Sequence, residues 1–182
     1  QSSGRTELAL AAIDRALALA PERSDYAMTK ALMQLGDKNL AESQSGLMDA
    51  LALNPNHLEA YIALLHIALG QKNLIEAKRL LKLAERVSPD ADSVFTAKGA
   101  IANAEGNVDE ALKWFSLAAE QNPGNVMALA NMGVLYTKLQ MPDFALQALT
   151  QAKTLAPSNI GILHALIQLS MEQNQLAQAE QA

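Results

Sequence analysis

Apolar residues recur along the chain with the period of an α-helix, in segments of about a dozen residues that short polar breaks separate. The segments form pairs, because a break rich in Gly, Asn or Gln follows the first and a proline break follows the second. Five of the six prolines lie 34 residues apart, without an insertion or deletion. These are Pro21, Pro55, Pro89, Pro123 and Pro157. This spacing predicts a repeat array in which each unit is a pair of helices.

The proline register divides the chain into units when each proline takes place 32 of a 34-residue unit. A partial unit, 1–23, comes first and holds a single helix over roughly Arg5–Leu19. A last partial unit, 160–182, is predicted to break at Gln173–Gln175, which gives about eleven helices in one segment. Pro142, out of register, falls where a helix should begin and suits its first turn. The four full units between them are 24–57, 58–91, 92–125 and 126–159.

Small residues keep the same places in successive units. Place 20 holds Ala9, Ser43, Ala77, Ala111, Ala145 and Ala179, and place 27 holds Ala16, Ala50, Ala84, Ala118 and Ala152. Place 8 holds Ala31, Leu65, Gly99, Gly133 and Ile167, and place 24 holds Ile13, Leu47, Leu81, Phe115 and Leu149. With proline at place 32, this pattern resembles the tetratricopeptide repeat (TPR) over essentially the whole chain. The resemblance implies an all-α, right-handed superhelical solenoid of antiparallel helix pairs. At each crossing, small residues admit a close neighbour and the large residue at place 24 fills the remaining space.

Composition narrows the class of function. The chain has 182 residues, a net charge of −5 and no cysteine, so disulfides and thiolate metal sites are excluded. The acidic balance disfavours nucleic acid as a partner, because nucleic-acid binders usually carry a basic face. Apolar runs stay well below the ~20 residues that a membrane helix needs, so this segment is not expected to insert into a bilayer.

The sequence offers little for catalysis. His57, His66 and His164 lie in different units, without a second ligand at metal-binding spacing. No nucleophile elbow, zinc-protease or phosphate-loop pattern occurs. The acidic pairs Asp90/Asp92 and Asp109/Glu110 fall at predicted helix starts, where they complement the helix dipole as caps. The sequence therefore predicts no enzyme, no cofactor and no metal.

The resemblance also implies a binding surface. In the TPR family the first helix of each unit lines a concave groove, and ligands contact places 2, 5, 9, 12 and 13. On this chain the resemblance assigns those places to Asp25, Met28, Leu32, Leu35, Glu59, Ile62, His66, Leu69, Ser93, Thr96, Ala100, Asn103, Met127, Ala130, Val134, Thr137, Gly161, His164, Gln168 and Met171. The Lys, Asn and Arg clamp with which the chaperone-binding branch holds a C-terminal carboxylate is missing.

Two surfaces leave alternatives open. Met28, Leu32, Leu35, Ile62 and Leu69 form an apolar strip that either takes an apolar-faced helix or extended peptide, or backs the packing between first helices. On the second helix of unit 58–91, four basic residues share a face that is either a solvated outer surface or a site for an acidic or phosphate-bearing partner. The four are Lys78, Arg79, Lys82 and Arg86.

The function predicted is a non-catalytic protein–protein interaction scaffold, one segment of a larger, bacterial-type repeat protein. The alternative is a regulatory or substrate-presenting arm of a larger enzyme or of a cell-envelope export or assembly complex. The compartment stays open between the cytoplasm and the bacterial periplasm or outer membrane, where such repeats occur in lipoproteins. Because the terminal helices, Arg5–Leu19 and Leu176–Ala182, lack capping units, we expect frayed ends or end-to-end self-association.

Overall fold

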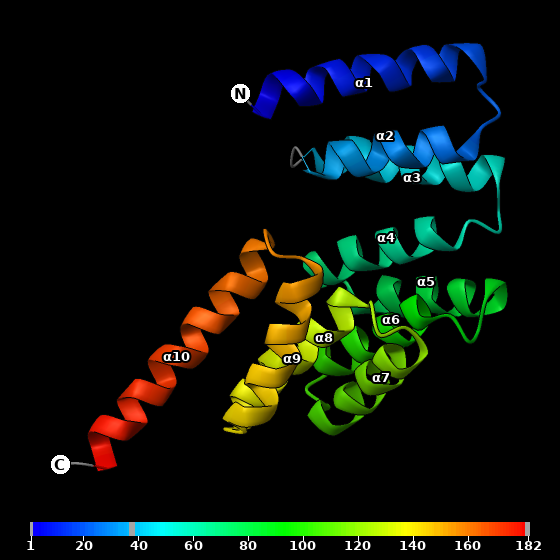
Figure 1. Cartoon of the computed structure of the whole chain (residues 1–182). Coiled ribbons are helices and arrows are strands. Elements are labelled where there is room, and N and C mark those ends of the chain that lie inside the picture. Colours follow the sequence, from blue (N-terminus) through cyan, green and yellow to red (C-terminus); the bar gives the residue numbers. More distant parts are fainter. Residues whose placement is uncertain (1, 37–38, 181–182) are drawn as a thin grey trace. The chain divides into compact units, whose positions relative to one another are not determined.

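The computed structural model of the chain describes the backbone of residues 2–36 and 39–180 (Figure 1). Side chains are described for residues 8–35 and 39–174. Within these ranges the chain forms ten α-helices and no strand. They are α1 (Ser2–Leu19), α2 (Ser24–Gly36), α3 (Leu40–Leu53), α4 (Leu58–Gly70), α5 (Leu74–Val87), α6 (Asp92–Ala104), α7 (Val108–Gln121), α8 (Val126–Lys138), α9 (Pro142–Leu155) and α10 (Ile160–Glu180).

The chain divides into two compact units, Gln1–Pro89 with α1–α5 and Asp90–Ala182 with α6–α10. The four predicted full repeats are the helix pairs α2–α3, α4–α5, α6–α7 and α8–α9, whose helices pack side by side (Figure 1). The all-α, paired-helix fold is therefore confirmed. That the whole chain is one solenoid segment stays a prediction.

Two expectations about helix ends have different outcomes. Pro142 is the first residue of α9, as predicted. The predicted break at Gln173–Gln175 is wrong, because α10 runs as one helix from Ile160 to Glu180. The described residues thus hold ten helices rather than eleven. Gln and Asn in that stretch tolerate helical backbone, and the stretch contains neither Gly nor Pro to end the helix.

In the pairs α6–α7 and α8–α9, the helices cross where a glycine faces a large residue. A Cβ atom added at Gly99 would lie 2.6 Å from the Phe115 ring, and one at Gly133 would lie 2.4 Å from Leu149 Cγ. Both large side chains are fully buried, as are the alanines at places 20 and 27 of the last three full repeats. The repeat pattern therefore marks the close crossings that the resemblance implied.

The proline joints close as tight turns. At four joints the N–H of place 34 donates to the C=O of place 31, which leaves proline as the second residue of the turn, where its fixed φ suits the geometry. These bonds run from Arg23 to Ala20 at 3.2 Å, His57 to Asn54 at 3.1 Å, Asn125 to Asn122 at 2.9 Å and Asn159 to Ala156 at 3.1 Å.

Place 15, in the break between paired helices, has left-handed backbone. Lys72, Gly106 and Gln140 have φ of 58°, 83° and 57°, and the corresponding Lys38 lies outside the described residues. Of these three residues, only Gly106 lacks the Cβ that makes this conformation costly. In each break the N–H at place 16 donates to the carbonyl at place 11, as from Asn73 to Ala68 at 2.8 Å. This helix-ending bond requires a left-handed residue just before it, whatever residue stands there.

Candidate peptide-binding groove

A groove runs between α8 and α10, the first helices of two successive repeats in the second compact unit. Its volume is about 420 Å³. It is lined mainly by apolar and small residues, and three of the predicted contact residues, Met127, Ala130 and Val134, lie along one wall. The groove is lined by Val126, Met127, Ala130, Asn131, Val134, Asn159, Gly161, Ile162 and Ala165.

The groove is open because several of its lining residues are small. Ala130 of α8 and Ala165 of α10 both line it, and Ile162, which also lines it, is buried at 2% exposure. Met127 and Val134 line the groove from α8 and are 48% and 38% exposed. An apolar side chain from another molecule would therefore meet apolar surface on both sides.

Polar groups stand at the two ends of the groove. A smaller hollow of about 90 Å³ shares Val134 and Ala165 with it and is also lined by Lys138, Gln168 and Glu172. Gln168 Nε2 donates to Glu172 Oε1 at 3.0 Å.

At the other end Asn159 Oδ1 accepts from Gly161 N at 3.0 Å, and between the two ends Asn131 Nδ2 donates to the Met127 carbonyl at 2.8 Å. Amide and charged groups at both ends could bind the backbone or the polar side chains of a peptide.

Sequence reasoning missed five groove residues, namely Val126, Asn131, Asn159, Ile162 and Ala165. Asn131 follows Met127 by four positions and so lies on the same helical face. That spacing could have added place 6 to the predicted set. Ile162 and Asn159 belong to the turn and first residues of α10, where the repeat places give no signal.

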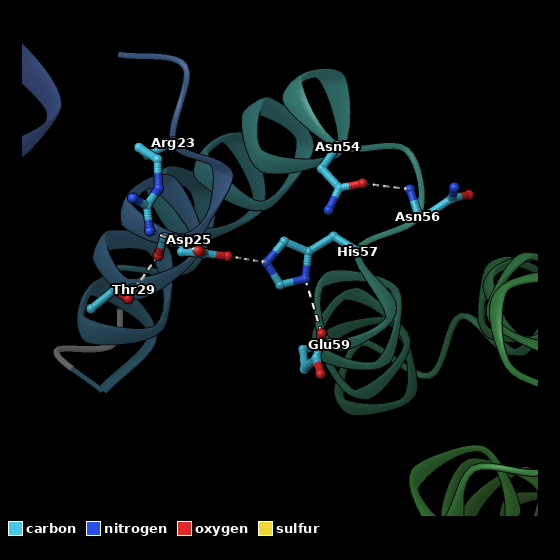
Figure 2. Close-up of polar contacts among 7 residues, drawn as sticks. All are labelled: Arg23, Asp25, Thr29, Asn54, Asn56, His57 and Glu59. Atoms are coloured by element: carbon cyan, nitrogen blue, oxygen red, sulfur yellow. Dashed lines mark hydrogen bonds and ion pairs between the residues drawn. The ribbon is translucent and has the colours of Figure 1, made fainter. Parts of the chain in front are cut away.

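In the first compact unit the predicted groove residues lie on α2 and α4, and polar contacts gather where the joint between α3 and α4 meets the start of α2 (Figure 2). His57 is the centre of this cluster: its Nδ1 lies 3.0 Å from Glu59 Oε2, and its Nε2 lies 3.7 Å from Asp25 Oδ1. Arg23 pairs with Asp25 at 3.3 Å, so polar contacts connect the start of α2, the joint and the start of α4. Asn54 Oδ1 accepts from the Asn56 N–H at 3.0 Å and orders the joint itself.

The five residues of the predicted apolar strip are not all exposed. Only Leu32 is freely exposed, at 45%, whereas Met28 is buried at 7%. Leu35, Ile62 and Leu69 are partly buried. Part of this strip therefore packs within the unit.

Two threonines among the candidates have structural roles. Thr96 is buried, accepts a hydrogen bond from Asn125 Nδ2 at 2.9 Å and donates to the Asp92 carbonyl. Asp92 is not the side-chain cap of α6 that the sequence predicted, because its carboxylate accepts from Asn122 and Asn125 of the next joint at 2.8 and 2.9 Å. Thr137 is also buried and donates to the Gly133 carbonyl.

The remaining candidates differ in exposure. Asp25, Glu59, His164, Gln168 and Met171 are exposed, and Ser93, Ala100 and Asn103 are partly buried. His66 on α4 is partly buried, and its Nε2 is buried without a hydrogen-bond partner. Burial lowers the pKa of His66 below its ordinary value near 6.5.

The basic residues of α5 are exposed, and Arg79 is paired with Glu76. Arg79 donates two hydrogen bonds of 2.7 Å to Glu76, which lowers the pKa of Glu76 and raises that of Arg79. Within the described residues, no group of three or more side chains could hold a metal ion. In the same part of the chain, no helix is both long and apolar enough to cross a membrane.

A scan of protein-family sequence models gives no match, and a search of curated proteins gives none either. Solved structures do match. A thermophilic TPR protein from Thermus thermophilus superposes with a TM-score of 0.75 at 22% identity, over 93% of this chain and 91% of that chain. A tetratricopeptide repeat protein from Parabacteroides merdae gives a TM-score of 0.75 at 15% identity, over 95% of this chain and 68% of that one.

A third match is YrrB, described as a TPR protein with an unusual peptide-binding site. Its TM-score is 0.52 at 25% identity, over 90% of this chain and 84% of that one. Together with the 34-residue proline register and the paired helices, these likenesses show that this chain has the fold of tetratricopeptide-repeat proteins.

Proposed function

We propose that the chain is a non-catalytic scaffold for protein–protein interaction, and that the groove between α8 and α10 receives an apolar side chain of a partner peptide. The observation that carries this proposal is an open, mostly apolar groove of about 420 Å³ at the repeat places where TPR proteins bind ligands. Open apolar surface with a few polar groups at its edge is typical of binding sites.

The side chains of the groove suit a peptide. Met127 is exposed and flexible, so it can adapt to side chains of different shape. Polar groups offer donors and acceptors to the peptide backbone along the groove: Asn159 at one end, Asn131 in the middle, and Lys138 and Glu172 at the other end. The likeness to YrrB, whose description names a peptide-binding site, supports the same class of ligand.

Peptides selected from a displayed random library against the purified chain provide the probe. We expect selected peptides to carry a large apolar residue and to bind the Val134→Lys variant about tenfold more weakly or worse, because a buried ammonium would oppose the contact. Leu146→Lys on α9 is the matched control, since Leu146 is 47% exposed and lies outside the groove.

Circular dichroism establishes that both variants fold. Equal affinity of wild type and Val134→Lys for every selected peptide would refute the groove. Loss of binding in both lysine variants would show that added charge, rather than the groove, controls binding.

A further inference from the structure

A second cleft, of about 430 Å³, lies in the first compact unit between α1, α2 and α3. Its apolar surface includes Leu17 of α1, Ala27 of α2 and Leu53 of α3, and its polar surface includes Lys30 and Glu42. It belongs to the second-helix side of the repeat, and none of the predicted contact residues lines it. What would fill this cleft can be learned from the same places of another repeat.

In repeat 92–125 an aromatic cluster and its polar partners occupy places 4, 7, 19 and 23. Trp114, at place 23, stacks on Phe95, at place 4, with ring centroids 5.8 Å apart and planes 19° apart. Lys98, at place 7, holds its Nζ 4.6 Å from the centre of a Trp114 ring. Trp114 Nε1 donates to Glu110 Oε1, at place 19, at 3.3 Å.

Repeat 24–57 keeps the polar half of this cluster and lacks the aromatic half. Its lysine and glutamate at places 7 and 19 are Lys30 and Glu42, whereas places 4 and 23 hold Ala27 and Gly46. All four residues line the cleft. The other two full repeats lack the lysine, and Leu80 and Ala148 at place 23 are buried. The cleft therefore opens where the chain's own equivalent repeat places an indole ring.

Polar groups around the cleft have partners within the chain. Lys30 Nζ pairs with Asp14 Oδ1 at 2.8 Å, and Glu42 Oε2 accepts from Gln34 Nε2 at 3.0 Å. Asp49 adds another carboxylate to the lining. The surroundings of Lys30 are thus acidic, which favours a neutral or basic peptide over an acidic one.

We propose that this cleft binds a tryptophan side chain of a partner protein. The indole ring lies against Ala27 and Gly46, its N–H donates to Glu42, and the Lys30 ammonium stands over its face, as Lys98 and Glu110 do for Trp114. The site is independent of the groove between α8 and α10, so either can fail without the other.

The test uses the full chain labelled with ¹⁵N and N-acetyl-L-tryptophanamide as the probe. We expect saturable shifts of the Ala27, Lys30 and Gly46 amides. Lys30→Met and Glu42→Ala should each weaken binding by about two- to fivefold, the factor that corresponds to a partly exposed cation–π contact or hydrogen bond. Lys82→Met on α5 is the matched control, because Lys82 is exposed and does not line the cleft.

N-acetyl-L-leucinamide is the control for a merely apolar site and should bind at least about threefold more weakly, since it has no ring for Lys30 to contact. Equal binding of the two amides would overturn the proposal. Absence of shifts at the three amides, or shifts that neither Lys30→Met nor Glu42→Ala weakens, would overturn it as well. The amide spectrum of each variant reports directly whether the chain is folded.

Discussion

At the residue scale, the left-handed position of a repeat break is often occupied by a residue for which this conformation is unfavourable. Gln140 has φ of 57° and Lys72 has φ of 58°. A side chain with a Cβ costs about 1–2 kcal/mol there, whereas glycine pays no steric penalty and loses some chain entropy instead. We expect Gln140→Gly to raise the free energy of unfolding by about 0.5–1 kcal/mol, as measured by urea denaturation.

The matched control is Gln71→Gly, because Gln71 has φ of −80° and gains nothing from glycine. This control should lower the free energy of unfolding. If both variants changed it in the same direction, backbone strain at Gln140 would not be the reason.

His66 gives the chain a pH dependence of its own. Burial lowers the pKa of His66 in the folded state, so the unfolded chain takes up a proton first as the pH falls below about 6.5. Its contribution to stability is complete above that pH and decreases below it, by at most about 1.4 kcal/mol per pH unit. We expect His66→Gln to lose less stability than wild type between pH 7.5 and pH 5.5 in urea denaturation.

The comparison needs a second histidine variant. His164→Gln on α10 is the control, since His164 is exposed, and it should leave the His66 contribution in place. A wild-type and a His66→Gln chain with the same loss of stability would contradict a buried, neutral His66.

At the element scale, the crossing of paired helices depends on the absence of a side chain. A Cβ at Gly99 would meet the Phe115 ring at 2.6 Å, and this ring is fully buried and has no room to move. We expect Gly99→Ala to lower the free energy of unfolding by about 1–2 kcal/mol, because overpacking outweighs the gain in helix propensity. Thermal or urea denaturation measures the change.

Gly70→Ala isolates the propensity effect. A Cβ at Gly70 would meet nothing within 4 Å, and its φ is not positive. This variant should be neutral or slightly stabilising. A Gly99→Ala chain as stable as Gly70→Ala would show that α6 and α7 separate at little cost.

Most helix boundaries could be predicted from the sequence, because proline at place 32 ends one helix and sets the start of the next. The end of α10 could not, since Gln173–Gln175 contains neither Gly nor Pro and the helix continues. The exposure of the groove residues could not be predicted from the sequence either. Thr96 and Ala130 share place 5, but Thr96 is buried through its bond with Asn125 while Ala130 lines an open groove. A repeat place gives the face of a helix, and the neighbouring residues decide the exposure.

At the scale of the whole molecule, we still expect a protein partner rather than nucleic acid, because the net charge of −5 opposes binding to a phosphate backbone. Exposed apolar side chains are the better candidates for contact with a protein partner, and α10 carries a clear example. Ile160, Ile167 and Met171 are 81%, 60% and 58% exposed and share one face of this helix.

This face of α10 is the basis of a last prediction, that copies of the 182-residue chain associate. In the full repeats place 8 is buried beneath the second helix, as at Ala31 and Leu65, whereas Ile167 at the same place of α10 is exposed. A helix of another copy can cover it, and sedimentation velocity at micromolar concentrations should show a mass above the monomer that rises with concentration. Ile167→Lys should abolish this association, because a lysine cannot be buried there without a partner.

Ile75→Lys is the matched control, since Ile75 is 86% exposed on α5, and it should associate like wild type. A wild-type chain that sediments as a monomer throughout would rule out association through α10.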